Sequence, residues 1–309
     1  MAILRAVIGD HREVRTLTEN DVRQYEARRT AGGITYGDGQ RTESVRQRSV
    51  QADIKLLKQM LSRACTRTTA QGTRWLEQNP LQYVRIRGEH DVKRPVASYE
   101  RYEATRQQMV LFQRKYELEM QTAKGAKERR RAESRHLSWV RAELGLSLLA
   151  ATGRRRGAIM GLRWSDFDAA SGCVTWRAEH DKKGKTWVVP YPTTFFATIR
   201  DFQKRLGAVG GFVFPRQGEP NESAPPELLS QWIRKAEVDA ELTKLQGGTC
   251  HPYRRKWRSE RPHHALKAVM QAGGWSDVNT MLRCYDHPEA SDVLAVTAEP
   301  RKRKESTSG

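Results

Sequence analysis

The stretch from Leu148 to Trp164 constrains the fold more than any other part of the chain, because its residues follow the period of a helix. One stripe recurs at spacings of four, three, four and three residues: Leu148, Thr152, Arg155, Ile159 and Leu162. This pattern predicts one continuous amphipathic helix with Arg155 directed inward, while Arg154 and Arg156 project about 100° to either side. An inward guanidinium needs an anion, which is either a structural carboxylate or a bound ligand.

Residues 1–90 are expected to form an all-helical domain. Thr18-Glu-Asn-Asp21 resembles the start of a helix, and Asn79-Pro80 is expected to close the domain. The clearest amphipathic segment is Ser49–Cys65, where apolar residues recur at helical spacing: Val50, Ile54, Leu57, Leu61 and Ala64. Its other surface carries basic residues that are either solvated or in contact with a DNA backbone: Lys55, Lys58 and Arg63.

A second domain is expected over residues 91–300, after a polar linker at Gly88–Pro95. It begins with a long helix over Tyr99–Tyr116, followed by the basic run Lys124–Arg131. This run is either a solvated loop or a loop or helix end that lies along a phosphate backbone, and its expected DNA contacts are Arg129, Arg130 and Arg131. Residues 301–309 are charged and polar and are expected to be disordered.

A β-hairpin is predicted in the middle of the second domain. Cys173–Arg177 and Thr186–Val189 are rich in strand-forming residues, and they flank a turn that contains a glycine. The turn would present Lys182, whose flexible ammonium could reach a leaving oxygen. Taken alone, a lysine in such a turn would only make the surface more soluble.

Two later helical segments carry further reactive side chains. His251 and Arg254 lie three residues apart, so they would share one face of a helical turn. Ser276 would cap a last helix whose inner side carries Val278, Met281, Leu282 and Tyr285. Taken alone, a tyrosine at such a position would be part of the core.

The charge of the chain favours a polyanionic partner. The 309 residues include 55 basic and 36 acidic side chains, which leaves a formal charge of +19, and neutralising phosphates releases counterions. A ribosomal or merely soluble basic protein is the alternative. No apolar run approaches the ~18 residues of a membrane span, and no signal pattern is found, so a cytoplasmic protein is expected. The chain has four cysteines without CxxC spacing: Cys65, Cys173, Cys250 and Cys284. This pattern argues against disulfides and a zinc site, so no metal is expected.

The ordered set of motifs resembles the tyrosine recombinase (phage integrase) family. The matching segments are the first box in Thr152–Arg155 and Leu162–Asp166, the hairpin lysine Lys182, the H-x-x-R box His251–Arg254, Gly273–Trp275 and the nucleophile position Tyr285. Lys182 stands eight residues before Pro190, and Tyr285 follows Arg254 by 31 residues. The resemblance covers roughly Val96–Pro300. It implies a fold that is mainly α with a small antiparallel β-sheet (α+β), with a helical core-binding domain before a catalytic domain.

The resemblance also implies a chemistry for the nucleophile and the protons. The phenol of Tyr285, whose ordinary pKa is ~10, would attack the scissile phosphorus to give a 3′-phosphotyrosyl link and a free 5′-hydroxyl. Lys182 would protonate the departing 5′ oxygen as a general acid, and His251 would assist proton transfer. Because the covalent link preserves the phosphodiester energy, rejoining would need no ATP, metal or cofactor.

The transferred phosphate would be bound by the remaining matched residues. Arg155 and Arg254 would hold the non-bridging oxygens, where charge accumulates in the transition state. The indole N–H of Trp275 would donate to a phosphate oxygen. The implied function is therefore that of a site-specific DNA recombinase, an integrase of a phage or another mobile element.

Three features of the chain bear on this expectation. The family usually has an acidic residue three positions after its first arginine, where this chain has Ala158. Asp166 and Glu179 are candidate substitutes. Tyr191 and Tyr253 are rival tyrosines, for which a structural role is expected. A catalytically weakened DNA-binding protein and a type IB topoisomerase-like enzyme are the alternative functions.

The resemblance implies partners as well. The family acts on double-stranded DNA as a tetramer, with a C-terminal segment donated to a neighbouring protomer; here Ala290–Val296 is apolar enough to be that segment. A directionality factor and a location at the nucleoid follow in the same way. No room is expected for an arm-binding domain upstream of residues 1–90.

Overall fold

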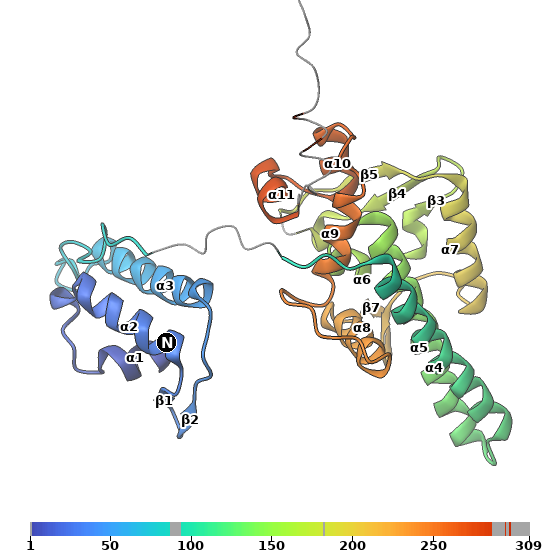
Figure 1. The fold of residues 1–309 in the computed structure, drawn as a ribbon, viewed down its shortest axis with the longest axis horizontal. Coiled ribbons are helices and arrows are strands. Elements are labelled where there is room, and N and C mark those ends of the chain that lie inside the picture. The colour runs from blue at the N-terminus through green and yellow to red at the C-terminus, as the bar shows by residue number, and fades with distance from the viewer. Residues whose placement is uncertain (1, 87–93, 182, 286–293, 295–296, 298–309) are drawn as a thin grey trace, which may run out of the picture. The chain divides into compact units, whose positions relative to one another are not determined.

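The computed structural model describes residues 2–86, 94–181, 183–285, 294 and 297. It divides the chain into two compact units, Met1–Val92 and Lys93–Gly309 (Figure 1). Both consist mainly of helices with small antiparallel sheets, which confirms the predicted fold class. Within the described residues, no helix combines the length and the apolar character that a bilayer span requires.

Over its described residues, 2–86, the N-terminal unit contains three α-helices, one 3-10 turn and a short hairpin. Its elements are α1 (Ala2–Ile8), η1 (Val14–Thr16), α2 (Glu19–Ala31), β1 (Thr35–Tyr36), β2 (Gln40–Arg41) and α3 (Gln47–Thr66). Thr18 caps α2 as predicted: its side chain accepts from the Asp21 amide, and the Asp21 carboxylate accepts from the Thr18 amide. The predicted stripe of α3 is buried at Val50, Ile54, Leu57 and Leu61, and its last member, Ala64, is partly buried.

The N-terminal unit continues beyond the dipeptide that was expected to close it. The side-chain amide of Asn79 donates to Lys58 O at 3.1 Å and to Ser62 Oγ at 2.9 Å, which ties this segment to α3. Leu81 then lies fully buried in the core of the unit. Sequence alone overlooked this return because its apolar residues are too few to show a period.

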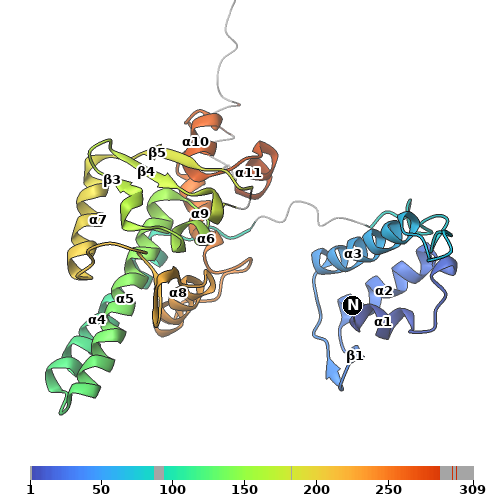
Figure 2. The ribbon, with the colours of Figure 1, turned by 180° about the vertical axis from the view of Figure 1, so that it is seen from behind.

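The C-terminal unit begins with a long helical hairpin. Ser98 caps α4 (Tyr99–Thr122), and α5 (Ala126–Thr152) runs back beside it (Figures 1 and 2). The basic run at Lys124–Arg131 spans the tip and the first turns of α5, so it is a helix end, and its contact with a phosphate backbone stays a prediction. In α5 nearly every position from 140 to 149 is buried, as expected of a helix that is surrounded by other elements.

A three-stranded antiparallel sheet lies next in the chain. Its strands β3 (Phe167–Asp168), β4 (Cys173–Trp176) and β5 (Trp187–Pro190) are ordered β3-β4-β5. The predicted hairpin is therefore present, with Trp176 directly opposite Trp187 in its register. The connection is longer than a simple turn, since it includes η3 (Ala178–His180).

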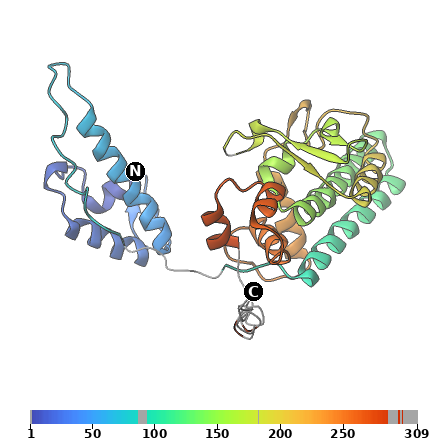
Figure 3. The ribbon, with the colours of Figure 1, turned by 90° about the horizontal axis from the view of Figure 1, so that it is seen from above.

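The remaining elements complete the helical body. They are α6 (Arg156–Met160), η2 (Trp164–Asp166), α7 (Thr193–Arg205), β6 (Pro215–Arg216), β7 (Glu219–Ser223), α8 (Glu227–Asp239), α9 (His251–Ser259), α10 (Leu266–Gly273) and α11 (Val278–Tyr285). Figure 3 shows α9, α10 and α11 gathered at one side of this unit, where α10 contacts β5 and α11 contacts α9. The main core joins α5 to the sheet and to α7 and α8.

Candidate active site

The predicted single helix across Leu148–Trp164 is wrong, because the chain breaks at Gly153. Gly153 adopts the left-handed conformation at φ +61°, and α5 ends one residue earlier. A Cβ at Gly153 would lie 2.5 Å from the Trp257 ring, so only glycine fits this position. The apolar stripe is nevertheless buried on both sides of the break. A glycine after a helical stripe is itself a signal for a helix end, and it could have indicated this boundary.

The break changes which arginine points inward. Arg154 is the buried one, with only 2% of its surface exposed, while Arg155 is partly buried at the N-cap of α6. Arg156 is exposed and donates to Glu227 Oε1 at 2.8 Å and to Ser230 Oγ at 2.9 Å. The inward position was thus assigned one residue too late, since the helical phase is interrupted between the left-handed Gly153 and the extended N-cap residue Arg155.

The H-x-x-R segment forms the first turn of α9, as predicted. Arg254 is 1% exposed, and its Nη1 donates to Gly273 O at 2.7 Å and to Gly153 O. The ring of Trp275 lies under this guanidinium, with 3.6 Å between Arg254 Cζ and the ring centroid. Trp275 also stacks on Trp257 at 5.9 Å between centroids.

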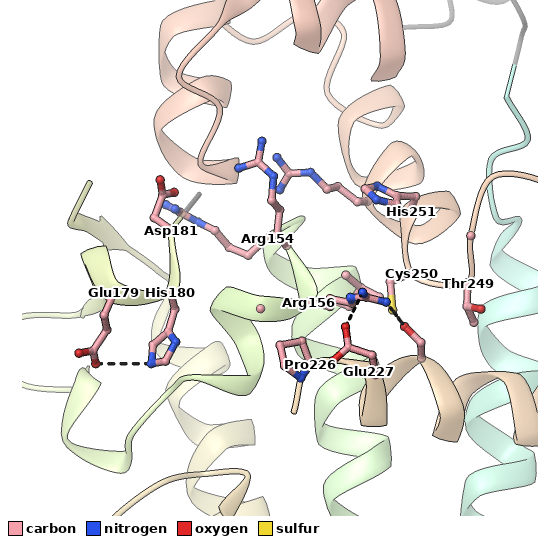
Figure 4. A pocket seen from close by; sticks show the side chains of 16 residues that line it. Arg154, Arg156, Glu179, His180, Asp181, Pro226, Glu227, Thr249, Cys250 and His251 are labelled. Atoms are coloured by element: carbon pink, nitrogen blue, oxygen red, sulfur yellow. Dashed lines mark hydrogen bonds and ion pairs between the residues drawn. The ribbon is translucent and has the colours of Figure 1, made fainter. Parts of the chain in front are cut away.

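One pocket of about 700 Å³ joins these segments. The ionisable residues that line it include Arg154, Arg155, Arg156, His180, Asp181, Glu227, His251 and Arg254. Asp181 and His180 lie on one side of the pocket and His251 on the other, with the Arg154 side chain between them (Figure 4). The structure thus brings Arg155, His251 and Arg254 together, from segments about a hundred residues apart in the sequence.

The electrostatics of the pocket are those of a cationic site. Desolvation by the surrounding protein, together with the charges of Arg255, Arg254, Arg155 and Arg156, lowers the pKa of His251 from 6.5 to about 4. The ring is therefore neutral at pH 7. Burial also lowers the pKa of the Arg154 guanidinium to about 10, and this group stays charged at neutral pH.

The predicted general acid and the predicted nucleophile lie at the edges of the described residues. Lys182 lies outside the described residues, although its neighbour Asp181 lines the pocket. Tyr285 is the last residue of α11, and the described structure covers its backbone only. Because α11 packs against α9, this backbone belongs to the same group of helices as His251 and Arg254.

The start of α11 differs from the prediction. Asp277, not Ser276, caps the helix: its carboxylate accepts from the Thr280 amide at 2.8 Å and from the Thr280 hydroxyl. Met281 is buried and Val278 partly buried, whereas Leu282 is 37% exposed. The expected inner side of this helix is therefore narrower than predicted.

Of the candidate substitutes for the acid missing at Ala158, only Glu179 reaches the pocket. It lies 3.4 Å from His180 Nε2. Asp166 is buried outside the pocket, where it pairs with Arg177 at 2.7 Å and accepts from the Arg163 amide. Glu227, which sequence reasoning missed, also lines the pocket and pairs with Arg156.

The rival tyrosines are part of the core: Tyr253 is buried and Tyr191 is partly buried. The hydroxyl of Tyr253 donates to Glu237 Oε1 at 2.8 Å and lies 3.1 Å from Thr105 Oγ1. Burial and the nearby carboxylate raise its pKa above the ordinary value. Tyr191 stacks on Phe195 at 4.5 Å, and burial raises its pKa to about 12. Both side chains are stable neutral parts of the core rather than ready nucleophiles.

The expected DNA contacts fall into two separate places. In the N-terminal unit, Lys55 and Arg63 are exposed on α3, whereas the ammonium of Lys58 donates to Gln82 O and Val84 O, both at 3.0 Å. In the C-terminal unit, Arg129, Arg130 and Arg131 are exposed near the tip of the α4–α5 hairpin, at the end away from α9 and α10 (Figures 1 and 2). These three arginines do not line the pocket.

The described side chains give two further facts on cysteines and metals. Cys65, Cys173 and Cys250 are free thiols. Among the residues whose placement is described, no group of three or more His, Cys, Asp or Glu side chains is arranged to hold a metal ion.

Comparison with known families identifies the fold and its class. The sequence profile of the phage integrase family matches residues 120–292, which is more than half of the chain. The chain belongs to the phage integrase family. By its family it is an enzyme of the tyrosine-type site-specific recombinase class, which confirms the resemblance inferred from the motifs.

Several solved structures share the fold. A XerH site-specific recombinase bound to a palindromic difH substrate has a TM-score of 0.61 at 13% identity, over 92% of this chain and 73% of that one. A lambda integrase dimer bound to a COC′ core site has a TM-score of 0.59 at 15% identity, over 98% and 88%. The Tn1549 transposon integrase in complex with transposon right end DNA has a TM-score of 0.56 at 14% identity, over 93% and 86%. No curated protein sequence matches.

Proposed function

We propose that this integrase-family chain is a site-specific DNA recombinase that cleaves and rejoins DNA through a 3′-phosphotyrosyl intermediate. The observation that supports it best is the meeting of Arg155, His251 and Arg254 in one cationic pocket. Similar proteins have been solved with DNA, among them the XerH post-cleavage complex and a lambda integrase tetramer bound to a Holliday junction. Double-stranded DNA is accordingly the proposed substrate.

Arg155 and Arg254 are the proposed phosphate-binding residues. Without DNA they donate to the neutral carbonyls of Gly274 and Gly273, at 3.0 and 2.7 Å. A phosphate oxygen is a stronger acceptor than a carbonyl, because its negative charge attracts the guanidinium and a phosphate group can accept from both arms of the arginine fork. The π face of Trp275 supports the Arg254 cation from below, and its indole N–H is a proposed donor to the phosphate.

The proposed proton transfers follow from the charge state of the pocket. His251 is neutral at pH 7, because desolvation first and the charges of the neighbouring arginines second lower its pKa to about 4. A neutral imidazole has a nitrogen acceptor, so we propose that His251 assists proton transfer, for example from the attacking phenol of Tyr285. Lys182 is the proposed acid for the departing 5′ oxygen, on the connection that follows β4. Since the phosphotyrosyl link stores the phosphodiester energy, the reaction needs neither ATP nor a metal ion.

Glu227 is the carboxylate that best replaces the acid absent at Ala158. It lines the pocket and holds Arg156, one of the charges that act on His251. Glu179 lines the same pocket but pairs with His180 instead. A catalytically weakened DNA-binding protein remains the outcome to test against.

The proposed assembly is a tetramer on two DNA duplexes, in which a C-terminal segment docks on a neighbouring protomer. The expected segment, Ala290–Val296, falls largely outside the described residues. DNA backbone contacts are proposed at the exposed groups of the two units: Lys55, Arg63, Arg129, Arg130 and Arg131. Lys58 is a weaker candidate, because its ammonium is already bonded to two carbonyls. An accessory directionality factor is a further proposed partner of this protein.

The test is a cleavage assay on nicked DNA that carries the end sequences of the element, with EDTA present. We expect wild type to form a covalent protein–DNA adduct on a denaturing gel and Tyr285→Phe to form none. Tyr99→Phe, which changes an exposed tyrosine of α4, is the matched control and should form the adduct as wild type does.

Other results would redirect the proposal. Tight binding of cognate DNA without an adduct from wild type would contradict cleavage and favour the DNA-binding alternative, with Ala158→Glu as the next variant. An adduct from Tyr285→Phe would remove Tyr285 as the nucleophile. Relaxation of supercoiled DNA by a monomer, without recombinant products, would favour the type IB topoisomerase-like alternative.

A further inference from the structure

The buried guanidinium of Arg154 is not used by the proposed chemistry. It lies against the two tryptophans that face each other across the β4–β5 hairpin, with 4.9 Å from Cζ to the Trp176 ring and 5.6 Å to the Trp187 ring. These rings mark the root of the connection that carries Lys182. A cation that lies over two aromatic rings is held in place while its planar edge can still donate hydrogen bonds.

That edge donates to the end of α10. Arg154 Nε donates to Ala272 O at 2.8 Å, and Nη2 donates to Gln271 O at 2.7 Å. The last carbonyls of a helix have no partners within the helix and carry partial negative charge, so a cation binds them well. The bend that follows fits the arginine closely: Gly274 has φ +68°, and a Cβ there would lie 2.4 Å from Arg154 Nη1.

The same bend holds the two proposed phosphate-binding arginines. Arg254 Nη1 donates to Gly273 O at 2.7 Å, and Arg155 Nη1 donates to Gly274 O at 3.0 Å. The next residue, Trp275, places its ring under Arg254. Three arginines therefore contact four consecutive carbonyls, 271 to 274, and Arg154 holds the two that come first.

We propose that Arg154 is a positioning residue for the cleavage reaction. It fixes the last turn of α10 against the sheet, and the carbonyls that follow then set the positions of Arg155 and Arg254. This inference rests on the proposed function of those two arginines. Lysine cannot reproduce the contact, because its point charge lacks the planar fork that reaches two carbonyls at once.

The experiment compares Arg154→Met and Arg154→Lys with wild type in the full chain. Arg163→Met is the matched control, since Arg163 also lies over an aromatic ring, 4.4 Å from the Phe212 centroid, but does not line the pocket. Hydrogen exchange is followed at the amides of Gly274 and Trp275, which are bonded to Gln271 O and Met270 O. Covalent adduct formation is measured at saturating nicked DNA, together with the Kd for DNA.

We expect Arg154→Met to speed exchange of these two amides by about tenfold. Its rate of adduct formation should fall by about tenfold or more while the Kd for DNA changes by less than about threefold. The reason is that misplaced Arg155 and Arg254 side chains slow the chemical step without weakening the binding of DNA. Arg154→Lys should fall between wild type and Arg154→Met. The control should match wild type in exchange and in rate.

Two results would overturn the inference. Unchanged exchange in Arg154→Met would mean that the arginine does not hold the bend, and this holds whatever the activity of wild type. Faster exchange with an unchanged adduct rate would mean that the bend does not position the reacting groups. Failure of the proposed function is recognised separately, because wild type itself would then form no adduct while the exchange measurement still decides whether Arg154 holds the bend.

Discussion

Removing one hydroxyl from Tyr253 should weaken the attachment of α9 without stopping cleavage. Its ring is 1% exposed, and its hydroxyl donates to Glu237 on α8, which also accepts from Arg101 Nε on α4 at 2.9 Å. Tyr253→Phe keeps the ring and removes one bond to a buried carboxylate. A hydrogen bond to a charged group contributes about 1.5–3 kcal/mol to the free energy of unfolding.

The loss converts to a measurable shift in Tm. For a unit of ~200 residues, each kcal/mol lowers Tm by about 2–4 °C, so a loss of about 2 kcal/mol predicts a decrease of about 4–8 °C. Calorimetry of the full chain measures this change in the unfolding of the C-terminal unit. Tyr83→Phe is the control, because Tyr83 is 87% exposed and its substitution should leave both transitions in place.

The same variant tests which tyrosine acts. Tyr253→Phe should still form the covalent adduct on nicked DNA below its lowered Tm, since the proposed nucleophile is Tyr285. A decrease in Tm of less than about 1 °C would refute the energetic importance of the Tyr253–Glu237 bond. A folded Tyr253→Phe protein that forms no adduct would refute the assignment of the nucleophile.

Two further predictions concern groups that line or flank the pocket. The pKa of His251 is about 4 in the folded chain and 6.5 ordinarily, so the unfolded chain binds the proton first and the free energy of unfolding should fall as pH drops through this window. Urea unfolding at pH 7 and pH 5 should show a smaller decrease in the free energy of unfolding for His251→Gln than for wild type. Equal decreases in the two proteins would contradict the role of His251. A Cβ at Gly161 would lie 2.1 Å from His180 Cδ2, so Gly161→Ala should lower the free energy of unfolding by about 1–3 kcal/mol. Adding His180→Ala should restore most of the lost stability, because it removes the clashing ring. Additive changes in Tm would show that the two residues do not clash.

Local patterns were sufficient to predict much of the fold. The capping residues at Thr18 and Asp21 and the stripe of α3 are confirmed, because each depends on residues within one or two helical turns. The β4–β5 hairpin is confirmed for the same reason. The helix break at Gly153 was overlooked because the stripe keeps its period across the break, although the glycine itself was a local signal.

The site was harder to predict where it depends on distant contacts. His251 and Arg254 were placed on one helical turn from their spacing alone, and the structure confirms this. The burial of Arg154 depends on Ala272 O, which is 118 positions away in the chain, and no periodicity in the sequence reports such a contact. Glu227 was overlooked for the same reason, since α8 approaches α6 only in the folded unit.

The distance between Arg155 and its acceptor has a consequence for newly made protein. Gly274 lies 119 positions after Arg155, and a ribosome that adds about 5–20 residues per second needs about 6–24 s to cover that interval. For most of this time the nascent chain already carries α3 and the α4–α5 hairpin but has neither α9 nor α10, which are made in the last part of the interval. The basic helices of a growing chain are therefore made well before the pocket exists, and the assembly of the pocket is one of the last events of synthesis.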